Sequence, residues 1–253
     1  MQDPERSVFR LTGQDCHDFL QNLVTNDVSG LEHGIVWTGL LTPQGKYLAD
    51  FFLVPDGDAI LIDVAEPLSK GLLQRLSMYK LRADVSIEVT DIAPARGSGP
   101  TPDGAFPDPR HASLGWRAYD GRPGDATDWL KLRIAIGLPE TGIELIPNES
   151  YPLEVGFEDF NGVDFRKGCY VGQEVTARMH HKTELKKGLR RVAVSGTAEF
   201  GTDILNAEGK SAGKLFSQSN GMGIAYLRFD RVTPVMTAGD AEITDATPLI
   251  SAK

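Results

Sequence analysis

The sequence predicts an α+β protein in which helices pack on a largely antiparallel sheet, followed by a small all-β module. Residues 7–89 alternate apolar, strand-like runs with two helical patterns, which is typical of an α+β layer. After Gly188 the apolar runs are short and separated by glycines, which favours a small barrel. Hydrophobic residues make up 41% and charged residues 24% of the 253 residues, as in ordinary globular proteins.

The first half of the chain predicts five strands and two helices. The strands are expected at residues 7–13, 34–41, 47–54, 59–64 and 85–89. Asp15 is the expected N-cap of the first helix, whose apolar residues recur at helical spacing. Pro67 is expected to open the second helix. Its inward side chains are expected to be Leu68, Leu72, Leu76 and Tyr79.

The second half begins with residues 93–113, which contain five prolines and three glycines and are expected to form a surface loop or linker. Thr127 or Asp128 is expected to cap a short helix that stops at Gly137. We expect residues 1–187 to form one α+β region and residues 188–253 to form the barrel.

The stretch KGCYVGQE at 167–174 contains one of only two cysteines. Val171, Val175 and Met179 follow at helical spacing, so a helix is expected to begin near Tyr170, with Cys169 at or just before its first turn. A helix N-terminus and the neighbouring Lys167 both lower a thiol pKa, which favours an activated thiol. The alternative is a small buried hydrophobe, since free cysteines are among the most buried residues.

Composition excludes several other classes. A net charge of −9 and a pI near 5.1 argue against direct nucleic-acid binding. No apolar run is long enough to span a membrane, and two cysteines favour a reducing cytoplasm. No CxxC or HxxxH pattern is present, so we expect no dedicated metal site, and His180 and His181 are expected to be solvated within the basic run 178–191.

Nearly the whole chain resembles the YgfZ family of folate-binding proteins, which are related to the glycine-cleavage T-protein, an aminomethyltransferase. KGCYVGQE is the most specific part of this resemblance. Family-like segments also occur in the family's order: FLQNLVTNDV at 19–28, LLTPQGKYLAD at 40–50, YKLRADV at 79–85, RIAIGLPETGIEL at 133–145 and YPLEVGFEDFNGVDF at 151–165.

The resemblance implies a ring of ferredoxin-like α+β subdomains around a folate channel, with a C-terminal β-barrel. It also implies tetrahydrofolate as cofactor and a role in assembling or maintaining 4Fe–4S proteins, including radical enzymes that thiolate tRNA. The implied partners are iron–sulfur client proteins or A-type cluster carriers. Cys169 is the implied functional thiol, and the other candidate catalytic residues are Lys167, Gln173 and Glu174.

The candidate folate contacts are Asn26, Asp27, Arg133, Tyr170 and Arg178. Asn26 and Asp27 have an alternative interpretation, in which they merely terminate a helix. Arg133 lies in an otherwise apolar helix and either meets the ligand or extends to the surface.

One departure separates the chain from aminomethyltransferases. An ungapped alignment puts Asp63 where those enzymes have an asparagine and Lys70 where they have a catalytic aspartate. The favoured hypothesis is therefore a folate-binding accessory factor for iron–sulfur proteins. The alternatives are a folate-dependent one-carbon transferase and a non-catalytic module whose partner docks on the basic run 178–191.

Overall fold

The computed structural model describes residues 5–182 and 184–249 and confirms the α+β prediction. Its central element is a five-stranded, fully antiparallel sheet in the order β2-β3-β4-β1-β5. The strands are β1 (Arg6–Thr12), β2 (Val36–Leu41), β3 (Tyr47–Asp56), β4 (Ala59–Ala65) and β5 (Ser86–Val89).

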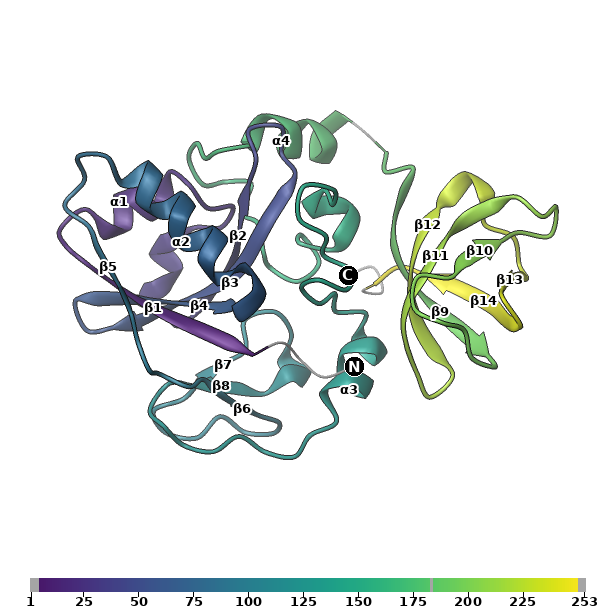
Figure 1. Cartoon of the computed structure of the whole chain (residues 1–253), viewed down its shortest axis with the longest axis horizontal. Helices are drawn as coiled ribbons and strands as arrows, with labels where there is room; N and C mark the ends of the chain where they lie inside the picture. Colours follow the sequence, from purple (N-terminus) through teal and green to yellow (C-terminus); the bar gives the residue numbers. More distant parts are fainter. Residues whose placement is uncertain (1–4, 183, 250–253) are drawn as a thin grey trace.

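One face of this sheet is covered by α1 (Cys16–Gln21) and α2 (Glu66–Lys80), which share an apolar core with β1, β3 and β4 (Figure 1). Leu72 and Leu76 are buried as expected, but Tyr79 is 39% exposed. Asp15 is the N-cap residue of α1 as expected, although its carboxylate accepts the backbone N–H of Asp84 and not one from the helix.

The other face packs against later parts of the chain. Trp37 and Phe52 on the sheet share a core with Phe157 and Phe160, and the ring centroids of Trp37 and Phe157 lie 4.6 Å apart. This core extends to Leu189 in the barrel. Three short helical segments of 3-10 type lie before the barrel: η1 (Val28–Glu32), η2 (Ala112–Leu114) and η3 (Pro152–Val155).

Residues 93–118 are more ordered than a linker. They form a three-stranded sheet of β6 (Ala95–Gly97), β7 (Phe106–Pro107) and β8 (Trp116–Ala118). The sequence pattern missed it because the strands are only two or three residues long and lie among prolines.

A buried ionic network ties this small sheet to the main one. Asp63 accepts hydrogen bonds from Arg6 at 2.6 Å and Arg117 at 3.2 Å, and Arg117 also reaches Asp108. Burial would raise the pKa of Asp63, but the two guanidinium groups hold it below its usual value.

Helix α3 (Trp129–Ile136) forms as predicted. The Asp128 carboxylate accepts the N–H of Lys131, and Gly137 ends the helix in the left-handed conformation. Helix α4 (Gln173–Lys182) begins within the last two residues of the KGCYVGQE stretch. No helix in the described ranges is long and apolar enough to cross a membrane.

The C-terminal part is a closed barrel in the order β10-β11-β12-β9-β14-β13, as expected. Figure 1 shows it at one end of the molecule. Its elements are β9 (Lys187–Ser195), β10 (Asp203–Leu205), β11 (Ser211–Ser219), β12 (Met222–Arg228), the 3-10 segment η4 (Phe229–Arg231), β13 (Met236–Ala238) and β14 (Ala241–Thr247).

Candidate functional site

The motif loop, residues 163–172, leads into α4 and carries Cys169. Cys169 is exposed, whereas Cys16 is buried in the core, where burial raises the pKa of its thiol. The expectation that Cys169 lies at a helix start was wrong, because α4 begins only at Gln173. The Cys169 thiol therefore lies on the loop before α4 and not at the N-terminus of the helix.

Lys167 anchors the first part of the motif loop. Its ammonium group donates to the backbone carbonyls of Gln21 at 2.9 Å, Val24 at 2.6 Å and Asn26 at 2.8 Å. Burial lowers the pKa of Lys167 to about 8, although Asp27 and Asp164 oppose this effect. Lys167 thus uses all three of its donors to hold the loop against the segment after α1.

Gly172 anchors the other end of the loop. Its φ is +85°, and a Cβ there would lie 2.5 Å from the carbonyl oxygen of Thr42. Gly45 of the β2–β3 hairpin faces it, since a Cβ on Gly45 would lie 3.2 Å from the Gly172 oxygen. The β2–β3 hairpin therefore approaches the backbone of the motif loop closely at Gly172. Gly168 has open space around it.

The remaining motif residues differ in environment. Tyr170 is buried, which raises the pKa of its phenol to about 12, and its ring centroid lies 5.3 Å from the Lys167 ammonium. The backbone N–H of Gln173 donates to Tyr170 O at 3.2 Å. Glu174 and Arg178 are exposed on α4. Lys167, Cys169 and Tyr170 thus lie in the motif loop, and Gln173 is the first residue of α4.

Asn26 and Asp27 hold the local structure together. The Asn26 side-chain amide donates to the carbonyls of Trp37 at 2.9 Å and Asn161 at 2.6 Å. Asp27 caps η1, and the N–H of Ser29 lowers the pKa of this carboxyl group. This geometry is closer to the interpretation in which Asn26 and Asp27 mark a helix boundary than to the one in which they bind a ligand. The boundary is the start of η1, because α1 already ends at Gln21.

Arg133 follows neither of its two expectations. It is buried, donates to Glu144 at 3.1 Å and to Leu138 O at 3.3 Å, and also bonds Ser217 on β11. Burial raises the pKa of Glu144, while Arg133 opposes that rise. Arg133 therefore joins α3 to the barrel and does not extend to the surface.

His180 corrects the expectation of a solvated histidine pair. Its ring packs edge-on against Phe165 with centroids 3.8 Å apart, and its Nε2 lies 3.6 Å from a Glu158 carboxylate oxygen. His181 is exposed. Among the described residues, no group of three or more His, Cys, Asp or Glu side chains is arranged to hold a metal ion. The contact between His180 and Phe165 had no sequence signal, because the residues are 15 positions apart in different elements.

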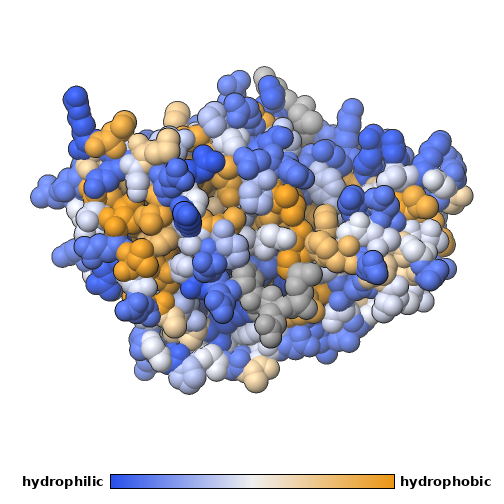
Figure 2. Space-filling view, in the orientation of Figure 1, coloured by the Kyte–Doolittle hydropathy of each residue, from blue (hydrophilic) through white to orange (hydrophobic). Residues whose placement is uncertain are grey.

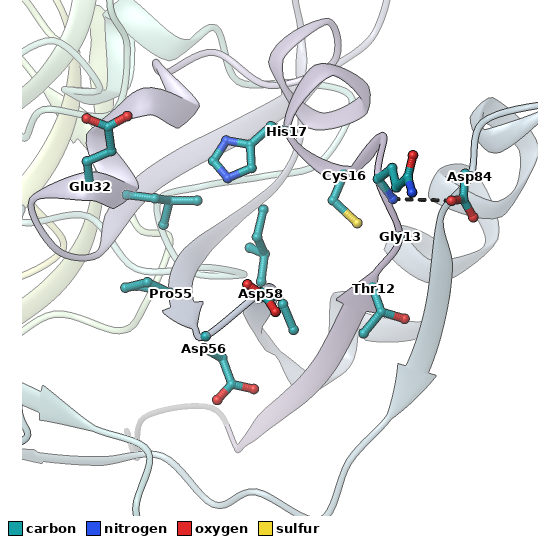
Figure 3. A pocket seen from close by; sticks show the side chains of 14 residues that line it. Thr12, Gly13, Cys16, His17, Glu32, Pro55, Asp56, Asp58 and Asp84 are labelled. Atoms are coloured by element: carbon teal, nitrogen blue, oxygen red, sulfur yellow. Dashed lines mark hydrogen bonds between the residues drawn. The ribbon is translucent and has the colours of Figure 1, made fainter.

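A cavity of about 750 Å³ lies elsewhere, between the start of α1, η1 and the β3–β4 hairpin (Figure 3). Figure 3 shows His17, Glu32, Asp56 and Asp58 around it, and Cys16 also lines it. None of the nine residues predicted for the site lines this cavity. A smaller cavity beside the motif loop includes Asn26 in its lining.

No carboxylate stands at the position that the alignment assigns to the catalytic aspartate of aminomethyltransferases. Lys70 is exposed on α2, and Asp63 is enclosed by Arg6, Arg117 and Tyr119. The Asp50 carboxylate is also bonded within the chain, because it accepts hydrogen bonds from the Trp37 indole at 3.0 Å and the Tyr47 hydroxyl at 2.7 Å.

Comparisons with known proteins agree with this architecture. Residues 186–250 match the family model described as CAF17, C-terminal beta-barrel domain. The chain is similar to a crystal structure of glycine cleavage system aminomethyltransferase T from Bartonella henselae, with a TM-score of 0.74 and 12% identity over 97% of this chain and 84% of that one. The predicted aminomethyltransferase-like fold with a C-terminal barrel is therefore confirmed.

Curated relatives cover most of the chain. It is 30% identical to the mitochondrial iron-sulfur cluster assembly factor IBA57 of Mus musculus, over 90% of this chain and 76% of the relative. It is 29% identical to the Homo sapiens protein of that name over the same shares, and 28% identical to the Mycosarcoma maydis homolog, over 90% and 73%. These relatives are mitochondrial by name, so the cytoplasmic location expected from the sequence is contradicted.

Proposed function

The chain belongs to the IBA57 family of iron–sulfur cluster assembly factors, and from that premise we propose that it acts in iron–sulfur protein assembly through the thiol of Cys169. Membership of the YgfZ family itself, and service to radical enzymes that thiolate tRNA, remain predictions from the sequence resemblance. The proposal concerns the thiol and the loop that carries it.

The observation that supports this most is an exposed cysteine on a loop held at both ends. Three carbonyls bind Lys167 two residues before Cys169, and Gly172 packs against the β2–β3 hairpin three residues after it. Without these two anchors an exposed loop would adopt many conformations, because an unconstrained backbone has high conformational entropy. The thiol is thus offered to a partner in a defined place.

The cysteine count supports a shared role for a partner. Iron–sulfur clusters are held mainly by several cysteine thiolates. This chain has two cysteines, and Cys16 is buried. Cys169 would therefore contribute one ligand or one acceptor sulfur, and an iron–sulfur client or A-type carrier would contribute the rest.

Tetrahydrofolate binding stays a prediction of the sequence resemblance, and three of the five residues chosen for it are engaged in bonds within the chain. The Asn26 amide, the Asp27 carboxylate and the Arg133 guanidinium are all bonded within the chain. Titration of the purified chain with tetrahydrofolate measures this binding separately, and the role of Cys169 does not depend on the result.

The test is rescue of 4Fe–4S enzyme activity in cells that lack their own family member. Wild type, Cys169→Ala and Cys16→Ala are compared at matched protein levels. We expect rescue by wild type and by Cys16→Ala, and loss of rescue by Cys169→Ala.

The Cys16 variant is the matched control, because it removes a thiol that is buried away from solvent. Its soluble level and melting temperature are measured alongside, since removing a buried sulfur costs some stability. Equal rescue by Cys169→Ala and wild type would refute the proposal.

A further inference from the structure

The cavity of about 750 Å³ beside α1 combines acidic groups with an apolar wall (Figure 3). Its acids are Glu32, Asp56, Asp58 and Asp84, and the described lining residues include no lysine or arginine. Two apolar lining side chains, Leu31 and Ile60, are 6% and 3% exposed. A volume of this size lies within the range of small-molecule sites, roughly 300–1,000 Å³. The cavity is thus large enough for an organic ligand.

The chain segments around the cavity carry an excess of negative charge. Residues 10–18, 27–33, 55–60 and 80–86 together contain seven acids and three lysines or arginines. One of these cations, Arg10, is already paired with Asp56 at 2.9 Å. The acids remain in excess even when His17 and His33 are protonated. The field in the cavity therefore favours a positively charged ligand.

The acids are spread around the cavity instead of meeting at one point. Figure 3 shows Glu32 on one side and Asp84 on the opposite side, with Asp56 and Asp58 between them. Within the part of the chain that the structure describes, no group of three or more His, Cys, Asp or Glu side chains is arranged to hold a metal ion. A ligand with several separated positive charges therefore suits this arrangement better than a single metal ion does.

Cys16 adds a buried polar group to the cavity wall. It is 3% exposed, and its thiol forms no hydrogen bond with the described residues. Figure 3 shows its sulfur inside the ring of lining residues. Burial and the neighbouring Asp84 raise the pKa of this thiol, which stays neutral. A neutral thiol is a weak hydrogen-bond acceptor with a soft, polarisable surface, so it can contact both an N–H group and a methylene chain.

We propose that this cavity binds a linear aliphatic polyammonium compound. The ammonium groups of the ligand face Glu32, Asp58 and Asp84. Its methylene chain covers Leu31, Ile60 and the Cys16 thiol. This inference goes beyond the proposed function and does not depend on the role of Cys169.

Two other occupants fit less well. A peptide from a partner would need free backbone groups to pair with, but β1, β3 and β4 beside the cavity each have a neighbouring strand on both sides. A second copy of the chain would bring two acidic surfaces together, and like charges repel. At the end of the molecule that carries α1, Figure 2 shows hydrophobic residues bordered by hydrophilic ones, a mixture that matches a ligand with both characters.

The test adds spermidine to the full-length protein at low salt. Calorimetry measures the affinity, and backbone amide chemical shifts locate the site. We expect one spermidine to bind per chain, with shifts at residues 12–17, 31–32 and 55–60 and none in the motif loop. Because exposed acids contribute to the site, the affinity is expected to fall as salt is added.

One pair of double variants gives a matched comparison. Glu32→Gln with Asp58→Asn removes two exposed cavity acids that form no ion pair with the described residues. It is expected to weaken spermidine binding roughly fivefold or more. Asp240→Asn with Glu242→Gln makes the same charge change at exposed positions of the barrel and is expected to leave binding unchanged. Melting temperatures verify that both double variants are folded.

Four results would overturn the proposal. The first is no binding of spermidine, and the second is an equal loss of affinity in the two double variants. The third is displacement of spermidine by magnesium ions as effectively as by a second polyamine at the same ionic strength, which would identify diffuse counterion attraction only. The fourth is tighter binding of a short acetylated lysine–alanine peptide than of spermidine, which would identify a surface for a basic protein instead.

Discussion

Two buried cations, Lys167 in the motif loop and Arg133 at the junction of α3 and the barrel, are stabilised in different ways. Lys167 is held by three neutral backbone carbonyls. Arg133 is paired with the carboxylate of Glu144 and reaches Ser217 on β11. Burial lowers the pKa of Lys167 to about 8. The junction therefore depends on an ion pair within the chain, whereas the motif loop is held by a lone cation whose pKa is lowered.

The largest effect is expected at the junction. Arg133→Met leaves Glu144 buried without its cation, and we expect a loss of about 3–5 kcal/mol in the free energy of unfolding. Urea denaturation measures it. Arg133→Met combined with Glu144→Leu is expected to recover much of the loss, because no unpaired charge then remains. A loss below about 1 kcal/mol in the single variant would show that Arg133 is not the connection inferred here.

The next effect is expected at the far anchor of the motif loop. Gly172→Ala places a Cβ 2.5 Å from Thr42 O at a φ of +85°, so we expect a loss of about 3 kcal/mol. Gly168→Ala is the matched control, because a Cβ there meets nothing within 4 Å, and its expected change is below about 0.5 kcal/mol. Equal losses in chemical denaturation would mean that the hairpin does not hold the loop.

Lys167→Met is expected to cost about 2 kcal/mol, since it leaves three carbonyls without their donor. Local hydrogen exchange distinguishes this variant from Arg133→Met. Hydrogen exchange is expected to accelerate in residues 163–172, and Arg133→Met should leave exchange there unchanged relative to the rest of the chain. Lys46→Met is the control lysine, as its ammonium lies 5.9 Å from the Tyr151 ring centroid instead of among carbonyls. Unaltered exchange in the motif loop of Lys167→Met would contradict its anchoring role.

A further expected effect is a dependence on pH. The pKa of Lys167 is about 8 in the folded chain and 10.5 as an unperturbed lysine, so between these values the unfolded state binds more protons. The unfolding free energy of wild type should therefore rise, relative to Lys167→Met, as pH increases from about 8 to about 10.5. Denaturation at several pH values, with Lys46→Met as reference, measures this difference. A fall over the same range would mean that burial does not control this lysine.

Much of the fold was predictable because its signals are local. The alternation of apolar residues located the strands of the main sheet, and Asp128 and Gly137 marked the two ends of α3. The small sheet of β6, β7 and β8 was not predictable, because strands of two or three residues have no periodicity. The start of α4 was placed too early, since Val171 packs against the sheet core from the loop and only mimics a helical position.

Candidate site residues were found by motif, but their contacts were not. KGCYVGQE indicated Cys169 and Lys167 as candidate site residues, and the structure places both in the motif loop. The same pattern could not show that the Lys167 ammonium is bound by residues more than 140 positions away. Arg133 appeared available for a ligand for the same reason, since Ser217 is 84 positions distant.

The sequence by itself determined the α+β layer, the barrel, the family resemblance and the cysteine on which the proposed function depends. Only the tertiary structure decided which polar side chains are already bonded, where the motif loop is anchored and which acids surround the cavity beside α1. The physical reason is that periodicity and turn residues act over a few positions, whereas hydrogen-bond satisfaction and burial depend on segments brought together from across the whole chain.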